Sequence, residues 1–119
     1  MFDFEKLVVY KKAKAFYKTL QIEILPLKEM DQVLKNQLRR SSSSIVLNIA
    51  EGCSRFSKAD KRNFYVIARG SVFESVAILD LLKENEMITA EKFQSLHSLA
   101  EELSRILFAL LSHQTPQEY

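Results

Sequence analysis

The stretch QLRRSSSSIVLNIAEG, from Gln37 to Gly52, decides how the rest of the chain is interpreted. Four consecutive serines are typical of a flexible linker between two domains. The leucines and isoleucines on either side, however, follow a spacing of 4, 7 and 4 residues that stays in helical phase across the serines: Leu34, Leu38, Ile45 and Ile49. A linker has no physical reason to keep this phase, so the stretch is predicted to be one rigid helix.

Small residues in this helix have a structural meaning. Serine costs roughly 0.5 kcal/mol per residue relative to alanine, but its small side chain lets a neighbouring backbone approach closely. Gly52 is expected to be the C-terminal cap, because glycine adopts the left-handed conformation of a cap at little cost. The predicted helix therefore spans residues 29–51.

Composition indicates an all-α fold. The chain has 119 residues, which is the size of one domain with its own core and no need of a metal or disulfide for stability. Its 47% apolar and 27% charged residues are those of a folded soluble protein, whereas two glycines and two prolines are too few for a turn-rich β fold. Residues 1–119 are therefore expected to form a single helical domain.

Two further helices follow from apolar or small residues that recur every three or four positions. In the last third of the chain these residues are Phe93, Leu96, Ala100, Leu103, Leu107 and Leu110. They predict a helix over residues 89–112 with Thr89 as its N-cap. The preceding seam consists of Phe64, Ala68, Ser71, Ser75, Ile78 and Leu82. It predicts a helix over residues 58–84, capped by Ser57 with Asp60 three residues later.

The first helix is expected over residues 4–25, because Pro26 cannot donate a backbone hydrogen bond and disfavours helix at the residue before it. Its buried side should hold Leu7, Tyr10, Tyr17, Leu20 and Ile24. Four helices of about 20 residues or more, joined by short connections, predict an antiparallel up-down-up-down four-helix bundle.

Charge is unevenly distributed along the chain, although the net charge is only +2. Residues 31–70 carry eight basic and three acidic side chains, and residues 71–119 carry three basic and eight acidic ones. The basic middle segment can attract a polyanion. It can equally attract the acidic part of the same chain or of a neighbouring subunit.

The basic segment supplies the candidate nucleic-acid-binding residues: Lys35, Arg39, Arg40, Arg55, Lys58, Lys61 and Arg62. Lysine and arginine bind phosphate oxygens through charge-assisted hydrogen bonds and release condensed counterions. Phe56, next to Arg55, either stacks on an unpaired base or anchors the loop against the end of the bundle. A solvated basic face is the alternative interpretation of the whole set.

A polar stripe lies beside the apolar one on the second helix: Gln37, Arg40, Ser44, Asn48 and Glu51. A buried stripe of this kind must satisfy its own hydrogen bonds, because an unpaired buried charge is costly. Arg69 and Glu74 on the third helix are candidate partners for it. The stripe is interpreted as a structural or interface network, with a functional pocket and a solvated face as the alternatives.

Sequence motifs for catalysis are absent. The chain contains no HExxH, GxSxG or SxxK motif and no glycine-rich phosphate loop. His97 and His113 are not at a metal-ligand spacing from each other or from Cys53. We therefore expect no enzyme activity, no metal and no cofactor. Arg55 is expected to lower the pKa of the Cys53 thiol, but a lone cysteine of this kind is rarely a nucleophile.

The chain is expected in the cytoplasm and outside membranes. One cysteine cannot form an internal disulfide, and the first residues have neither the basic region nor the apolar region of a signal peptide. The longest purely apolar run, residues 106–111, is far shorter than the roughly 20 residues of a membrane span.

Four groups of residues together resemble a known family: QLRR at 37–40, Ser44-Ile45, NIAEG at 48–52, and ARGS at 68–71 followed by Glu74. They are similar to the bacterial four-helix-bundle family associated with intervening sequences in 23S ribosomal RNA genes, which also includes the accessory variability protein of diversity-generating retroelements. The resemblance covers nearly the whole chain. It implies a bundle that assembles into a homopentameric ring and is not known as an enzyme, and some relatives resemble nucleic-acid-binding adaptors.

Two functions are therefore expected. The preferred one is a non-enzymatic, oligomeric nucleic-acid-binding or adaptor protein, which contacts RNA or DNA through the basic surface of the second and third helices. The alternative is a protein–protein scaffold that binds no nucleic acid. The third helix also has five apolar residues off its main seam: Tyr65, Val66, Val72, Phe73 and Val76. They favour a homo-oligomer in either case, because a helix that is apolar on more than one side needs more than one neighbour.

Overall fold

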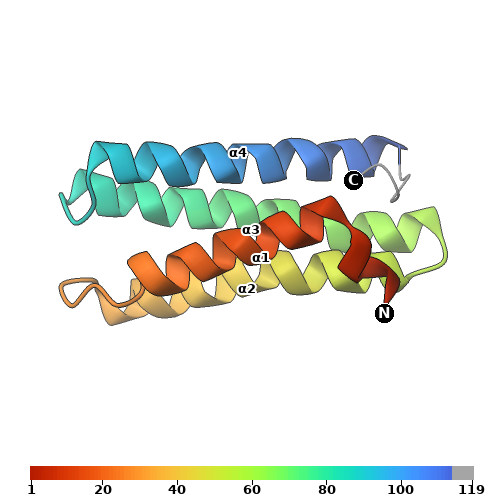
Figure 1. Cartoon of the computed structure of the whole chain (residues 1–119), viewed down its shortest axis with the longest axis horizontal. Coiled ribbons are helices and arrows are strands. Elements are labelled where there is room, and N and C mark those ends of the chain that lie inside the picture. Colours follow the sequence, from red (N-terminus) through yellow and green to blue (C-terminus); the bar gives the residue numbers. More distant parts are fainter. Residues whose placement is uncertain (114–119) are drawn as a thin grey trace.

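The structure, a computed structural model, describes residues 1–113 and contains four α-helices in one bundle. A 3-10 turn precedes them, and the elements are η1 (Asp3–Lys6), α1 (Val8–Glu23), α2 (Gln32–Ser54), α3 (Lys58–Glu84) and α4 (Ala90–His113). Successive helices run in opposite directions, and α1 closes the bundle against α4 (Figure 1). The prediction of an all-α antiparallel four-helix bundle is confirmed.

The beginning of the first helix differs from the prediction. A helix was expected from residue 4, but η1 ends at Lys6 and Leu7 adopts an extended conformation with φ −70° and ψ 131°. This break turns the Leu7 side chain into the core, where it is almost completely buried. The Phe4 ring packs edge-on against the Tyr10 ring, with 4.8 Å between the ring centroids. The N-terminal turn therefore lies against the bundle as a separate element.

The serine run lies inside α2, as its helical phase predicts. Ser41 and Ser75 share a hydrogen bond with 2.8 Å between their hydroxyl oxygens. The Ser42 hydroxyl donates to the backbone carbonyl of Leu38 at 2.7 Å. Ser41, Ser42 and Ser75 are all buried, and their short side chains let α2 and α3 pack closely without leaving their hydroxyl groups unpaired.

Gly52 does not end α2, so its predicted role as a left-handed cap is wrong. No glycine in the described chain has a positive φ, and α2 continues through Gly52 to Ser54. A Cβ atom at Gly52 would lie only 2.6 Å from Cε1 of Tyr65 on α3. Glycine is needed here because the buried Tyr65 ring packs directly on the backbone of α2. At the other end, α2 begins three residues after the predicted start, where the Asp31 carboxylate accepts a hydrogen bond from the Leu34 N–H.

The predicted caps of the last two helices are confirmed. The Ser57 hydroxyl accepts a hydrogen bond from the Asp60 N–H at 3.1 Å, and the Thr89 hydroxyl accepts one from the Lys92 N–H at 3.0 Å. The predicted α4 seam is also confirmed, since Leu96, Ala100, Leu103, Leu107 and Leu110 are buried.

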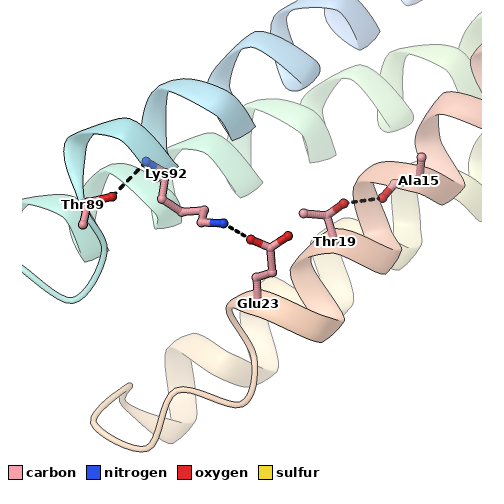
Figure 2. A network of polar contacts seen from close by, with 5 residues as sticks. All are labelled: Ala15, Thr19, Glu23, Thr89 and Lys92. Atoms are coloured by element: carbon pink, nitrogen blue, oxygen red, sulfur yellow. Dashed lines mark hydrogen bonds and ion pairs between the residues drawn. The ribbon is translucent and has the colours of Figure 1, made fainter.

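Ion pairs between exposed side chains join the first and last helices. Figure 2 shows Lys92, near the start of α4, paired with Glu23 at the end of α1. Closer to the middle of α1, Lys12 pairs with Glu102 at 3.0 Å. Exposed pairs of this kind contribute at most about 1 kcal/mol each, so apolar packing rather than charge holds the bundle closed. None of the helices within residues 1–113 has the length and apolar character needed to cross a membrane.

Candidate nucleic-acid interface

The structure places the seven candidate basic residues in two groups. Arg55, Lys58, Lys61 and Arg62, here called the end cluster, surround the turn between α2 and α3. Lys35, Arg39 and Arg40 lie in the first half of α2, toward the opposite end of the bundle (Figure 1). Because a helix rises about 1.5 Å per residue, Arg39 and Arg55 are separated by about 24 Å along α2. The seven candidate basic residues therefore do not form one continuous surface.

Three members of the end cluster also make contacts within the chain. The Lys61 ammonium donates to the backbone carbonyl of Cys53 at 3.0 Å, and the Arg62 guanidinium donates to that of Leu111 at 3.1 Å. Both bonds satisfy carbonyls at helix C-termini, where the helix dipole favours a cation. An ammonium has three donors and a guanidinium has five, so each side chain keeps donors for a phosphate.

Arg55 and Lys58 occupy the two sides of the turn. The Arg55 guanidinium pairs with the Glu51 carboxylate at 3.3 Å and lies 4.7 Å above the centroid of the Phe64 ring. Lys58 is the first residue of α3, and its side chain is exposed. These contacts orient Arg55 while leaving its outer edge in solvent, so the end cluster presents cations on both sides of one short turn.

A cleft of about 650 Å³ opens beside the end cluster. Its walls come from η1, the last turns of α2, the turn between the helices and the first turn of α3. Phe2 and Phe56 line it with relative exposures of 74% and 102%. Of the two roles considered for Phe56, that of a loop anchor is excluded, because an anchor would be buried against the bundle.

Cys53 lines the same cleft and is half-buried. Burial raises the pKa of its thiol; the nearby Lys61 acts in the opposite direction, and Asp3 reinforces the rise. The expected lowering of the pKa by Arg55 is therefore wrong, since desolvation outweighs the effect of Lys61, the cation that acts on this thiol. A protonated thiol is a poor nucleophile and a poor metal ligand. Within residues 1–113, no three His, Cys, Asp or Glu side chains are grouped so that they could hold a metal ion.

The centre of the polar stripe is a hydrogen-bonded contact between α2 and α3. The Asn48 amide donates to the Ser44 hydroxyl and to the Ser44 backbone carbonyl, both at 2.9 Å. The Ser71 hydroxyl donates to the Ser44 hydroxyl at 2.9 Å. At the C-terminal end of the stripe, Glu51 pairs with Arg55 in the end cluster.

Arg69 does not face the polar stripe. Two residues turn a helix by about 200°, so Arg69 and the stripe contact Ser71 lie on opposite sides of α3. The Arg69 side chain points toward α4, where its Nε donates to the Ser104 carbonyl at 3.4 Å and its guanidinium lies over the rings of Phe73 and Phe108. Glu74 is exposed and forms no ion pair within residues 1–113. Neither residue partners the stripe within the described chain, contrary to expectation.

The comparisons with known proteins bear on the family and the fold. The sequence pattern of the 23S rRNA-intervening sequence proteins matches residues 5–109. The chain belongs to this family. A crystal structure of a protein with unknown function from the S23 ribosomal protein family of Bacteroides thetaiotaomicron is similar, with a TM-score of 0.80 and 29% sequence identity over 87% of this chain and 98% of that chain. No curated protein matches the sequence.

A second surface contains two of the off-seam apolar residues of α3, Val66 and Phe73, whereas Tyr65 and Val72 are buried within the chain, contrary to expectation. Val66, Gly70, Phe73 and Phe108 form what is here called the α3/α4 patch. The three apolar side chains are 47%, 56% and 57% exposed. A Cβ atom at Gly70 would meet no described atom within 4 Å. The sequence signals for this patch are a glycine inside a helix and apolar residues off the buried seam.

Proposed function

We propose that this protein is a non-enzymatic homo-oligomer that binds RNA or DNA through the end cluster. The observation that carries the proposal is the position of Arg55, Lys58, Lys61 and Arg62 around one exposed turn. Such a group of cations can bind several adjacent phosphates and release their counterions. It would recognise the backbone and shape of the nucleic acid rather than its sequence.

The α3/α4 patch supports the assembly part of the proposal. The exposed aromatic rings and the open glycine of this patch, on α3 and α4, suit contact with a second copy of the chain. A homopentameric ring, as the family resemblance implies, would present the end cluster five times. Repetition raises the overall affinity of a weak site, because every contact after the first is intramolecular.

The proposal is tested with a variant whose end cluster carries no charge. In this variant glutamine replaces each of the four residues: Arg55, Lys58, Lys61 and Arg62. Glutamine removes the charges without setting a carboxylate against the helix C-termini that Lys61 and Arg62 cap. We expect binding to structured RNA and duplex DNA to be lost at moderate salt, while helical content and oligomer mass stay as in the parent.

A matched control loses four charges elsewhere. It replaces four exposed lysines by glutamine: Lys11, Lys14, Lys18 and Lys28. Binding should survive in this variant. Equal loss in both variants would mean that net charge alone drives binding, and full binding by the end-cluster variant would contradict the proposed surface.

The second candidate function is a protein–protein scaffold that binds no nucleic acid. The α3/α4 patch favours it, because exposed aromatic side chains are enriched where proteins bind one another. An intact oligomer that binds neither RNA nor DNA at low salt would support the scaffold. The end cluster would then serve subunit contacts or an acidic protein partner.

A further inference from the structure

Phe56 is an exposed aromatic ring on a fixed backbone. Its relative exposure is 102%, so its apolar surface gains nothing from burial within the chain. The residues on either side are held by helix ends: the Arg55 N–H donates to the Gly52 carbonyl at 3.2 Å, and the Ser57 hydroxyl caps α3. The turn therefore fixes the backbone of Phe56 before any ligand arrives, which lowers the entropy cost of binding at this residue.

The cleft beside Phe56 has the size and lining of a site for a planar polar molecule. Its volume of about 650 Å³ lies within the usual range for small-molecule sites. A second exposed ring, Phe2, lines it and stacks on Phe4 with 5.9 Å between centroids and 11° between planes. The Ser54 hydroxyl and the Glu51 carboxylate add hydrogen-bonding groups to the wall. Aromatic faces with a few polar groups suit a nucleobase, which has a π-face and polar edges.

The charges in the cleft favour a base over a free anion. Arg55 and Lys61 line it together with Asp3 and Glu51, so the cationic and anionic side chains balance. A small anion would gain little there, whereas a neutral base would meet no repulsion. Phosphates on either side of that base would meet Lys58 and Arg62, which belong to the end cluster but do not line the cleft.

We infer that the cleft takes one unpaired base of a structured RNA, stacked on Phe56, while Lys58 and Arg62 of the end cluster hold the flanking phosphates. RNA fits this site better than duplex DNA, because its loops and bulges offer unstacked bases beside a folded backbone. This inference rests on the proposed function and adds to it the kind of nucleotide that is bound. The protein would then prefer RNA with unpaired nucleotides over a blunt duplex.

The experiment compares an RNA hairpin with a blunt-ended RNA duplex that has the same stem. The chain contains no tryptophan, so Phe56→Trp creates a single fluorescent reporter at the site. We expect the hairpin to quench this fluorescence and the duplex to leave it almost unchanged. Phe56→Ala should weaken hairpin binding by about tenfold or more, as expected for the loss of one stacked base, and should leave duplex binding unchanged. Because the side chain is fully exposed, neither substitution threatens folding.

The control is Ile22→Ala, which removes an exposed apolar side chain at the far end of α1 and should change neither affinity. If Phe56→Ala binds the hairpin as tightly as the parent, or if the duplex quenches the fluorescence of the Phe56→Trp variant equally, the base-stacking inference is wrong and the end-cluster function stands. If the parent binds neither RNA, the inference fails; the proposed function fails with it if the protein does not bind duplex DNA either.

Discussion

The two glycines of the chain, Gly52 and Gly70, have very different surroundings. A Cβ atom at Gly52 would lie 2.6 Å from Cε1 of Tyr65, whereas one at Gly70 would meet no described atom within 4 Å. Both glycines lie inside helices, where glycine costs about 1 kcal/mol relative to alanine. Packing within the chain accounts for Gly52. Nothing in the described part of the chain accounts for Gly70, and the exposed aromatic rings near it support the proposed contact with a second copy.

The largest effect is expected from Gly52→Ala. The added methyl group would press on the buried Tyr65 ring, and overpacking of this kind typically costs about 1–3 kcal/mol. The 2.6 Å approach puts this cost near the upper end, about 3 kcal/mol. After a gain of about 1 kcal/mol in helix propensity, we expect a net loss of about 2 kcal/mol in the free energy of unfolding. Urea denaturation at fixed protein concentration measures it. Unchanged stability would mean that Tyr65 does not pack on the α2 backbone.

Gly70→Ala should act in the opposite direction on the single chain. At concentrations where the protein is monomeric, we expect the free energy of unfolding to rise by about 1 kcal/mol, because alanine is the better helix former and the site is open. At high concentration the same methyl group should weaken assembly, which light scattering would register as a lower mass. A more stable chain with an unchanged oligomer would remove Gly70 from the subunit interface.

Tyr65→Phe should have the smallest effect at neutral pH. The buried hydroxyl of Tyr65 has no hydrogen-bond partner in the described part of the chain, so its removal should change stability by no more than about 1 kcal/mol. A large loss of stability at pH 7 would reveal a partner for this hydroxyl in the folded protein.

Alkaline pH should separate Tyr65→Phe from the parent. Burial, with a smaller contribution from Cys53, raises the pKa of Tyr65 to about 12. The pKa of a tyrosine in the unfolded chain is about 10. Between these values the unfolded chain has lost a proton that the native chain keeps, so stability falls as pH rises above about 10. Denaturation at pH values of about 8 and about 11 should show a smaller fall in the variant, and identical slopes would contradict the burial of this hydroxyl.

The sequence predicted the helices well, because N-cap residues and apolar spacing are signals that a few neighbouring residues carry. Ser57 and Thr89 cap their helices as expected. The helical spacing of the apolar residues correctly predicted that the serine run lies inside α2. Gly52 was misinterpreted because a capping glycine and a close-packed glycine look alike until the neighbour, Tyr65, is known. The break at Leu7 likewise depends on packing of the N-terminal turn against the rest of the bundle.

The candidate site was harder to predict than the fold. The separation of Arg39 from Arg55 follows from helix geometry alone and could have been derived from the sequence. The direction of Arg69 toward α4 and the full exposure of Phe56 depend on how the helices pack, so the sequence left both open. Ligand binding depends on exposed side chains, whereas hydrophobic periodicity identifies the buried ones.

The most direct test of the central claim is the salt dependence of duplex DNA binding by the nuclease-treated protein. Oligomer mass is measured in the same buffers. The logarithm of the binding constant should fall linearly with the logarithm of salt concentration, with a slope of about −0.9 for each neutralised phosphate. Neutralising the four residues of the end cluster should make this slope shallower by roughly 3 to 4 for each copy engaged. An unchanged slope, or no binding at low salt by an intact oligomer, would contradict the role of the end cluster in nucleic-acid binding.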